Sequence, residues 1–345
     1  MYRINVLRRL ALAGTLLAFC VVVFGAYVRL TDAGLGCPDW PGCYGHVTPA
    51  QAAAANAGTV EAPLHEGKAW REMIHRYGAS TLGLIILVIA GLAWHWRRQP
   101  GMPVRLSLTL VALVIFQGLL GMWTVTLLLK PLIVTLHLIF GLTTLSLLWW
   151  LWLSLRRRST SPWSGSVSAM GGGTAAALLL PAPPLVRRAA LIALIALSVQ
   201  IILGGWTSTN YSAVACPDFP TCQASWWPEA DYKDAFVLWR GLGINYEGGV
   251  LDHPARVAIH FTHRLGAIVA TLALLFASIA SLRGRPGRNR RSAAIAVIAA
   301  LVLQLAIGIF MVKRGFPLWL ATAHNAGAAL LLLSTLALNR ALRRV

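Results

Sequence analysis

The stretch EMIHRYGA at residues 72–79 opens a long apolar run, so it places a glutamate, a histidine and an arginine at the mouth of a membrane helix. The chain repeats the phrase at 260–267 as HFTHRLGA, with a second histidine in place of the glutamate. Ionisable residues inside a bilayer are costly and are usually functional. The two phrases therefore predict two related sites in an all-α membrane protein, of which only the first carries a carboxylate.

The composition of the whole chain agrees with a membrane protein. Of its 345 residues, 57% are hydrophobic and 12% are charged, and the mean hydropathy is +0.66. A soluble domain would be about a quarter charged. The first apolar run leads into a loop with no small-residue cleavage site, so we expect it to be retained. Eight runs are long enough to span a hydrocarbon layer of roughly 30 Å as helices, and they lie near 10–30, 73–94, 106–128, 132–153, 189–208, 257–281, 293–312 and 318–339.

The net charge of +19 is distributed unequally between the two sides of these helices. With eight spans, one side carries 19 arginines and no acidic residue, in the segments 1–9, 95–105, 154–188, 282–292 and 340–345. The other side carries the remaining 11 basic residues and all 11 acidic ones. Positively charged loops stay in the cytoplasm. The charge therefore predicts cytoplasmic termini, and nucleic acid is not an expected partner.

The chain is an internal duplication. The predicted halves are 1–155 and 189–345, joined by a cytoplasmic linker at 156–188 that is rich in Ser, Gly, Ala and Pro. Because each half holds four spans, both halves keep one orientation and form two pseudo-symmetric four-helix bundles. Four anchors recur in order: CPDWPGC (37–43) as CPDFPTC (216–222), His75-Arg76 as His263-Arg264, Gln117 and Gly121 as Gln304 and Gly308, and Thr135-x-His137 as Thr322-x-His324.

Four of the nine histidines lie at a similar depth near the outer ends of the spans, within roughly 5–10 Å of each other along the membrane normal. The repeat pairs His75 with His137 and His263 with His324. Two imidazoles that face each other across a bundle can hold a haem iron from both sides. Zinc fits less well, because it needs further ligands and no cysteine lies at that depth. The remaining histidines, apart from His260, are expected to be ordinary loop or interfacial residues.

Glu72 precedes His75 by three residues, so the two side chains share one face of a helix. A carboxylate beside an iron site can accept a proton, stabilise a cation or orient a water; alternatively, Glu72 pairs only with Arg71 or Arg76. His260 takes its place in the second half and is an alternative ligand beside His263. Arg76 and Arg264 could pair with haem propionates, or their side chains could simply reach the interface.

The cysteines of the outer loops form two closely spaced pairs. A disulfide between Cys216 and Cys222 is predicted mainly to staple its loop, whereas Cys37 and Cys43 suit a staple or a redox-active thiol pair equally well. Cys20, inside the first span, is expected to be a small buried apolar residue.

Taken together, these motifs resemble the haem A synthase family of membrane enzymes. The resemblance rests on GAYVRLTDAGLGCPDWPGC (25–43), on the ExxHR phrase at 72–76, and on the later histidines with their repeat in the second half. It implies an eight-helix pseudo-symmetric bundle that oxidises a ring methyl of haem O to a formyl group, giving haem A for terminal oxidases. It also implies haem O synthase and an electron acceptor as partners, and allows a homo-oligomer. The short segment of about nine residues before the first span favours a bacterial inner (plasma) membrane over an organelle-targeted precursor.

The resemblance assigns roles to individual residues. The second half would hold a haem b through His263 and His324. The first half would receive haem O between His75 and His137, with Glu72 as the essential acid. Cys37 and Cys43 would match a pair that joins the chain of reducing equivalents.

Two routes for the hydroxylation follow from the resemblance. In one, electrons leave the haem O methyl, Glu72 stabilises the resulting cation and water captures it. In the other, oxygen is activated directly at an iron. The main alternative function is a quinol-linked dihaem b-type electron-transfer cytochrome, which would use the same four histidines but would not need Glu72. A thiol oxidase leaves the histidine repeat unexplained, and a transporter would place its polar groups nearer the midplane.

Overall fold

The computed structural model describes residues 2–55, 65–159, 182–284 and 286–343. Within these ranges eight helices are long and apolar enough to cross a membrane, which confirms the predicted spans. They are α1 (Tyr2–Leu30), α3 (Glu66–His95), α4 (Val104–Thr126), α5 (Pro131–Ser159), α6 (Pro184–Thr209), α8 (His253–Leu282), α9 (Arg288–Lys313) and α10 (Leu318–Leu342). Short elements lie between them: α2 (Pro49–Ala55), the 3₁₀ turn η2 (Ala213–Ala215) and α7 (Tyr232–Ala235).

Several helices extend beyond the predicted apolar runs. α1 begins at Tyr2 rather than near residue 10, and α5 continues to Ser159 rather than ending near residue 153. Arginine has a high helix propensity, so the arginine-rich ends continue the helices past the apolar run. Part of the predicted linker is therefore helical at its two ends, and 160–181 lies outside the described residues.

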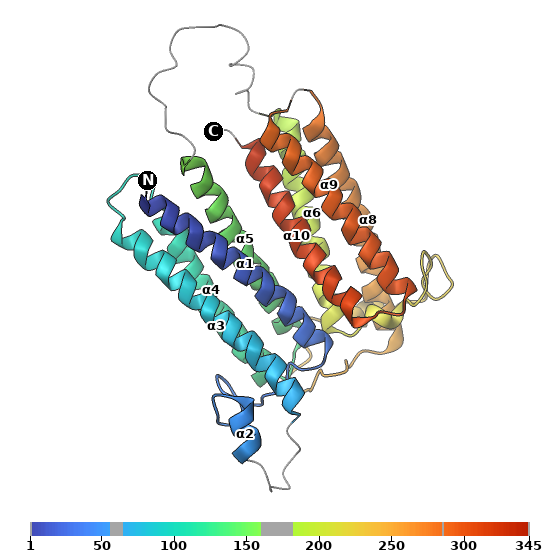
Figure 1. Ribbon diagram of the computed structural model, residues 1–345. Helices are drawn as coiled ribbons and strands as arrows, with labels where there is room; N and C mark the ends of the chain where they lie inside the picture. The colour runs from blue at the N-terminus through green and yellow to red at the C-terminus, as the bar shows by residue number, and fades with distance from the viewer. Residues whose placement is uncertain (1, 56–64, 160–181, 285, 344–345) are drawn as a thin grey trace, which may run out of the picture.

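The helices form two groups of four (Figure 1). In the first group α1 packs against α3 and α5, and α4 packs against the same two helices. In the second, α6 packs against α8 and α10, and α9 also packs against both. The groups meet through α1 with α10, α5 with α6, and α5 with α10. These are the pairs that a two-fold rotation would exchange, as the sequence repeat predicts, and the symmetry itself stays a prediction.

Helical periodicity builds the apolar core of the bundle. On α5, Leu145, Leu148, Leu151 and Leu155 recur every three or four residues, so they share one face, and all four are buried. On α3, by contrast, Leu84, Leu87 and Val88 point outward and are exposed. Exposed leucine and valine are suited to lipid, which is as apolar as they are.

The outer loop after α6 reaches back over the first group and ties the two halves together. The Tyr246 amide donates to the Leu128 carbonyl at 3.0 Å, and Lys68 pairs with Glu247 at 3.3 Å. The buried Lys130 donates to the Gly241 carbonyl and lies over the Trp239 ring. The start of α1 and the end of α10 lie at the opposite end of the molecule from these loops (Figure 1).

Candidate functional site

Each of the four predicted histidines lies against a glycine of a neighbouring helix. A Cβ placed on Gly25 would lie 2.7 Å from Cε1 of His75, and one placed on Gly204 would lie 3.0 Å from Cε1 of His263. The corresponding distance is 3.4 Å for Gly121 and His137 and 3.0 Å for Gly308 and His324. Glycine lets the backbone of one helix approach a ring closely. The four rings therefore sit in closely matched cradles.

The structure brings His75 of α3 and His137 of α5 together across the first group. Their ring centroids are 6.4 Å apart and their planes are inclined at 70°. A metal bound to a nitrogen of each ring would separate the two centroids by two metal–nitrogen bonds of about 2 Å each and by the distance from each nitrogen to the centre of its own ring. The sum is close to the observed separation of the centroids. One metal atom would therefore fit between the two rings. His263 of α8 and His324 of α10 hold the equivalent positions in the second group.

Buried ring nitrogens without a hydrogen-bond partner are compatible with histidines that bind haem. Nδ1 of His75, His137 and His324 is buried and has no hydrogen-bond partner among the described residues. Most buried polar atoms in proteins do have a partner, so these atoms suit rings that meet a further group. Nowhere in the described ranges do three His, Cys, Asp or Glu side chains gather as a site for a bare ion. Two histidines per site suit an iron whose other ligands come from a porphyrin.

Glutamines from adjacent helices contact three of the four histidines. Nε2 of Gln117 donates to the backbone carbonyl of His137 at 2.8 Å, and Nε2 of Gln304 lies 3.2 Å from Nε2 of His324. Nε2 of Gln200 lies 3.0 Å from Nδ1 of His263. The sequence analysis did not assign these glutamines to the sites, although the recurrence of Gln117 as Gln304 was a signal for two of them.

Glu72 is buried beside the first histidine pair and is held at both oxygens. Its Oε2 accepts a hydrogen bond of 2.8 Å from the backbone N–H of Cys37, and its Oε1 pairs with Arg76. Arg76 also donates to the carbonyls of Asp39 and Gly42 in the Cys37–Cys43 loop. The carboxylate is therefore positioned by the disulfide loop as well as by its own helix.

His260 takes the place of Glu72 and is likewise bound to a loop. Its Nδ1 lies 3.2 Å from the Ser212 carbonyl, and its Nε2 accepts from Nε of Arg264 at 3.2 Å. Arg264 donates to the carbonyls of Cys216, Asp218 and Thr221 at 2.7–2.9 Å. One ring nitrogen of His260 thus faces the loop after α6 and the other faces Arg264 of its own helix. Its role as an alternative ligand stays a prediction.

The two arginines bind equivalent carbonyls, which neither reading of the sequence anticipated. Arg76 donates to the carbonyls of the first, third and sixth residues of CPDWPGC, and Arg264 donates to those of the same three positions of CPDFPTC. Each guanidinium therefore holds one cysteine loop against its helix. Pairing of Arg76 or Arg264 with a propionate stays a prediction.

Both cysteine pairs are disulfide-bonded, Cys37 with Cys43 and Cys216 with Cys222. An aspartate organises each loop: Asp39 accepts from the amides of Tyr44 and Gly45, and Asp218 accepts from those of Gln223 and Ala224. Burial tends to raise the pKa of Asp218, but the hydrogen bonds from Thr221, Ala224 and Gln223 outweigh it and lower that pKa below its usual value. The aspartate therefore stays ionised and keeps its loop folded at neutral pH.

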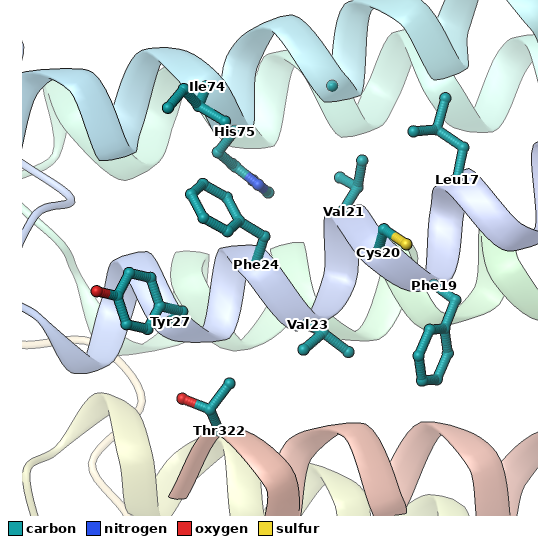
Figure 2. Close-up of a pocket in the computed structure, with 11 residues that line it drawn as sticks. Leu17, Phe19, Cys20, Val21, Val23, Phe24, Tyr27, Ile74, His75 and Thr322 are labelled. Carbon is teal, nitrogen blue, oxygen red and sulfur yellow. The ribbon is translucent and has the colours of Figure 1, made fainter. Parts of the chain in front are cut away.

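A cavity of about 590 Å³ opens beside His75. Figure 2 shows His75 pointing from α3 towards Phe24 of α1, with Tyr27 of α1 and Thr322 of α10 at one end. The lining is largely apolar. Cys20 is part of it and is exposed, so the expectation that Cys20 is buried is wrong. It lies on the face of α1 that borders this cavity and is not packed between helices.

Comparisons with known proteins cover nearly the whole chain. The model of the family COX15-CtaA, described as cytochrome oxidase assembly protein, matches residues 8–336. The chain is 42% identical over 338 residues to the heme A synthase of Shewanella oneidensis, which covers 96% of this chain and 94% of that protein. It is 28% identical over 360 residues to the heme A synthase of Rhizorhabdus wittichii, covering 97% and 93%. The residues 8–336 that the family model matches span both histidine pairs and both cysteine loops of this chain.

Proposed function

Because the chain belongs to the COX15-CtaA family of cytochrome oxidase assembly proteins, we propose that it is a haem A synthase that oxidises haem O in its first half and holds a haem b in its second. The activity is that of an oxidoreductase, which converts a ring methyl of haem O to the formyl group of haem A. One observation carries the assignment of the two halves: Glu72 is buried one helical turn from His75, and His260 stands at the equivalent position.

The first half provides the substrate site. His75 and His137 would take the iron of haem O between their rings, which are 6.4 Å apart. The apolar cavity beside His75, bounded by α1, α3 and Thr322, suits the farnesyl-derived tail of the substrate. In the second half, His263 and His324 would hold haem b, which would supply a one-electron relay when bound.

Glu72 acts on the charge that develops during the oxidation. Each hydroxylation takes two electrons from the methyl carbon, adds the oxygen of one water and releases two protons. After the second hydroxylation, loss of water leaves the formyl group. The Glu72 carboxylate stabilises the cationic methyl carbon and accepts a proton from the water that captures it.

The setting of the enzyme is also part of the proposal. The arginine-rich ends support cytoplasmic termini in a bacterial inner membrane, with the disulfide loops on the oxidising side. Two partners are required by the chemistry: an enzyme that supplies haem O and an electron acceptor. The proposal also allows a homo-oligomer.

Extraction and identification of the bound haems tests the proposal directly. We expect protein purified from cells that make haem O to contain haem b together with haem O, haem A or a hydroxylated intermediate. Haem b alone, at two per chain, would support the dihaem cytochrome instead. Protein without any haem would show that the histidine pairs have another role.

Replacing Gly25 with alanine should weaken the substrate site selectively. The new Cβ would lie 2.7 Å from Cε1 of His75, so the ring must move. We expect haem A formation to fall by about tenfold or more while haem b is retained, because misplaced reacting groups cost on the order of 100-fold in rate. Haem analysis of membranes from cells that make Gly25→Ala and from cells that make the unaltered protein measures haem A formation and haem b content.

Gly91→Ala is the matched control, because nothing lies within 4 Å of a Cβ at that position on α3. Alanine favours a helix over glycine at either site, so an equal loss in both variants would contradict a role for the Gly25 cradle.

We expect the Cys37–Cys43 loop to support haem A formation and the Cys216–Cys222 loop to support haem b binding. Replacing Cys37 and Cys43 together with serine frees the loop whose Cys37 N–H binds Glu72. We expect haem A formation to fall by roughly tenfold or more with haem b intact, because the carboxylate loses a fixed partner. Replacing Cys216 and Cys222 should instead lower the haem b content. If the protein with serine at positions 37 and 43 forms as much haem A as the unaltered protein, this loop does not position Glu72.

A further inference from the structure

A second cavity, of about 600 Å³, lies between the start of α6 and the end of α10. The two helices pack against each other there, and Nδ2 of Asn339 donates to the Ala190 carbonyl of α6 at 2.9 Å. This end of the molecule carries the chain termini (Figure 1), and the charge distribution predicts that it faces the cytoplasm. The lining of the cavity includes Arg187, Arg188, Leu191, Asn339, Leu342 and Arg343.

Three guanidinium groups share this cavity without a carboxylate. In the described part of the chain, no acidic side chain pairs with Arg187, Arg188 or Arg343. The outer side differs, because Arg76 there pairs with Glu72. The predicted cytoplasmic segments contain no acidic residue in the sequence. Three like charges around one cavity repel each other, so the cavity favours an anion.

Arg343 is oriented by an aromatic ring. Its guanidinium lies over Trp150 of α5, 4.6 Å from the ring centroid. A guanidinium that stacks on a ring keeps the N–H donors at its edge, and these donors match two oxygens of a phosphate. The helix dipoles do not decide the sign of the potential, because α6 begins and α10 ends at the cavity and the two ends offset each other. The arginine charges therefore decide it.

An exposed apolar stripe on α6 continues from the cavity. Leu191 lines the cavity and is exposed, and further exposed residues follow it every three or four positions, at Ile195, Val199 and Ile202. At 1.5 Å of rise per residue the stripe is about 16 Å long, close to half of a hydrocarbon layer of roughly 30 Å. A phospholipid with its head group in the cavity would therefore have an apolar surface as long as one leaflet beside its acyl chains. A free phosphate would not contact this stripe.

The first half differs at the position of Asn339. The arginines of the cavity recur there as Arg8-Arg9 and Arg156. Trp152 takes the place of Asn339, however, and its ring stacks on that of Trp149 with the centroids 4.7 Å apart. An indole thus stands where the second half has a smaller amide, so we expect the site in the second half alone.

We propose that the cavity between α6 and α10 binds the phosphate group of an anionic phospholipid from the leaflet on the arginine-rich side. Basic pockets between membrane helices on the cytoplasmic side are suited to such head groups. The bound phosphate would offset the repulsion among the three arginines and join α6 to α10, and through Arg343 and Trp150 to α5. The inference does not rest on the haem chemistry proposed above.

The test is a titration of the full-length protein, purified in detergent and freed of lipid, with dioleoylphosphatidylglycerol, followed by native mass spectrometry. Dioleoylphosphatidylcholine has the same acyl chains without a net charge, and inorganic phosphate is added as a competitor. The pocket variant changes the three arginines of the cavity: Arg187→Gln, Arg188→Gln and Arg343→Gln. The control variant removes the same charge from exposed arginines elsewhere on that side: Arg98→Gln, Arg288→Gln and Arg291→Gln.

We expect the unaltered protein to bind one phosphatidylglycerol about tenfold or more tightly than phosphatidylcholine, and inorganic phosphate not to displace it. The pocket variant should bind phosphatidylglycerol about 100-fold more weakly, because each arginine near an anionic head group contributes about fivefold. The control variant should bind it as the unaltered protein does. Size-exclusion profiles report whether both variants are folded.

Three results would overturn the inference. An equal loss in the pocket and control variants would show that the total surface charge, and not this cavity, attracts the lipid. Equal binding of the two lipids would show that the site does not select an anion. Displacement by inorganic phosphate would assign the cavity to a free phosphate. None of these results depends on which haems the protein holds, so failure here and failure of the proposed function are distinguishable.

Discussion

Replacing Glu72 with alanine is expected to abolish haem A formation, with a loss of about 100-fold or more, while haem b stays bound. General acid–base groups contribute about 10²–10⁴-fold to a rate, and Glu72 is the buried carboxylate on the helical face of His75. The second half has His260 at that position, so its haem should not depend on Glu72. Separation and quantification of haems b, O and A extracted from the purified variant measures the effect.

Two further variants divide the contribution of Glu72 into charge and position. Glu72→Gln keeps an oxygen that can accept from the Cys37 N–H but removes the negative charge. If charge stabilisation matters most, this variant should be nearly as inactive as Glu72→Ala. Glu66→Ala is the control, because Glu66 is an exposed carboxylate on the same helix, where it accepts a hydrogen bond from Nε1 of Trp70. Normal haem A formation in Glu72→Ala would rule out the role assigned to this residue.

Removing either ligand of the second half should strip haem b from the protein. We expect His263→Ala and His324→Ala to lose most of their haem b, because each removes one of the two proposed side-chain ligands to the iron. Haem A formation should fall with it, since electrons would lose their relay. The pyridine haemochrome content per chain and the low-spin absorption spectrum measure the loss.

His260→Ala is the matched control for the ligand assignment. His260 lies one turn before His263, but its two nitrogens face the Ser212 carbonyl and Arg264. We expect this variant to keep haem b, with some loosening of the Cys216–Cys222 loop that Arg264 holds. Loss of haem b from His260→Ala together with its retention in His263→Ala would exchange the roles of the two histidines.

The eight spans and the family could be predicted from the sequence with little error. Hydrophobic length and the order of CPDWPGC, ExxHR and the later histidines are properties of the linear chain. The cysteine loop, the His-Arg pair and the later histidine recur in the second half. Helix ends were less predictable, because arginines near Arg156 extend α5 past the apolar run. Cys20 was misassigned since a residue within a membrane span can face a cavity or lipid as well as a neighbouring helix.

The sequence by itself determined the eight apolar helices that can cross a membrane, the motifs that recur in its second half, and the glutamate of one half that is a histidine in the other. Only the tertiary structure decided what those polar groups bind: Arg76 and Arg264 hold the disulfide loops, the Cys37 N–H holds Glu72, and Gln200 contacts His263. The reason is physical. Membrane insertion depends on local apolar length and charge, whereas a hydrogen bond requires two groups from distant parts of the chain to meet within about 3 Å, and only the packing of the helices brings them together.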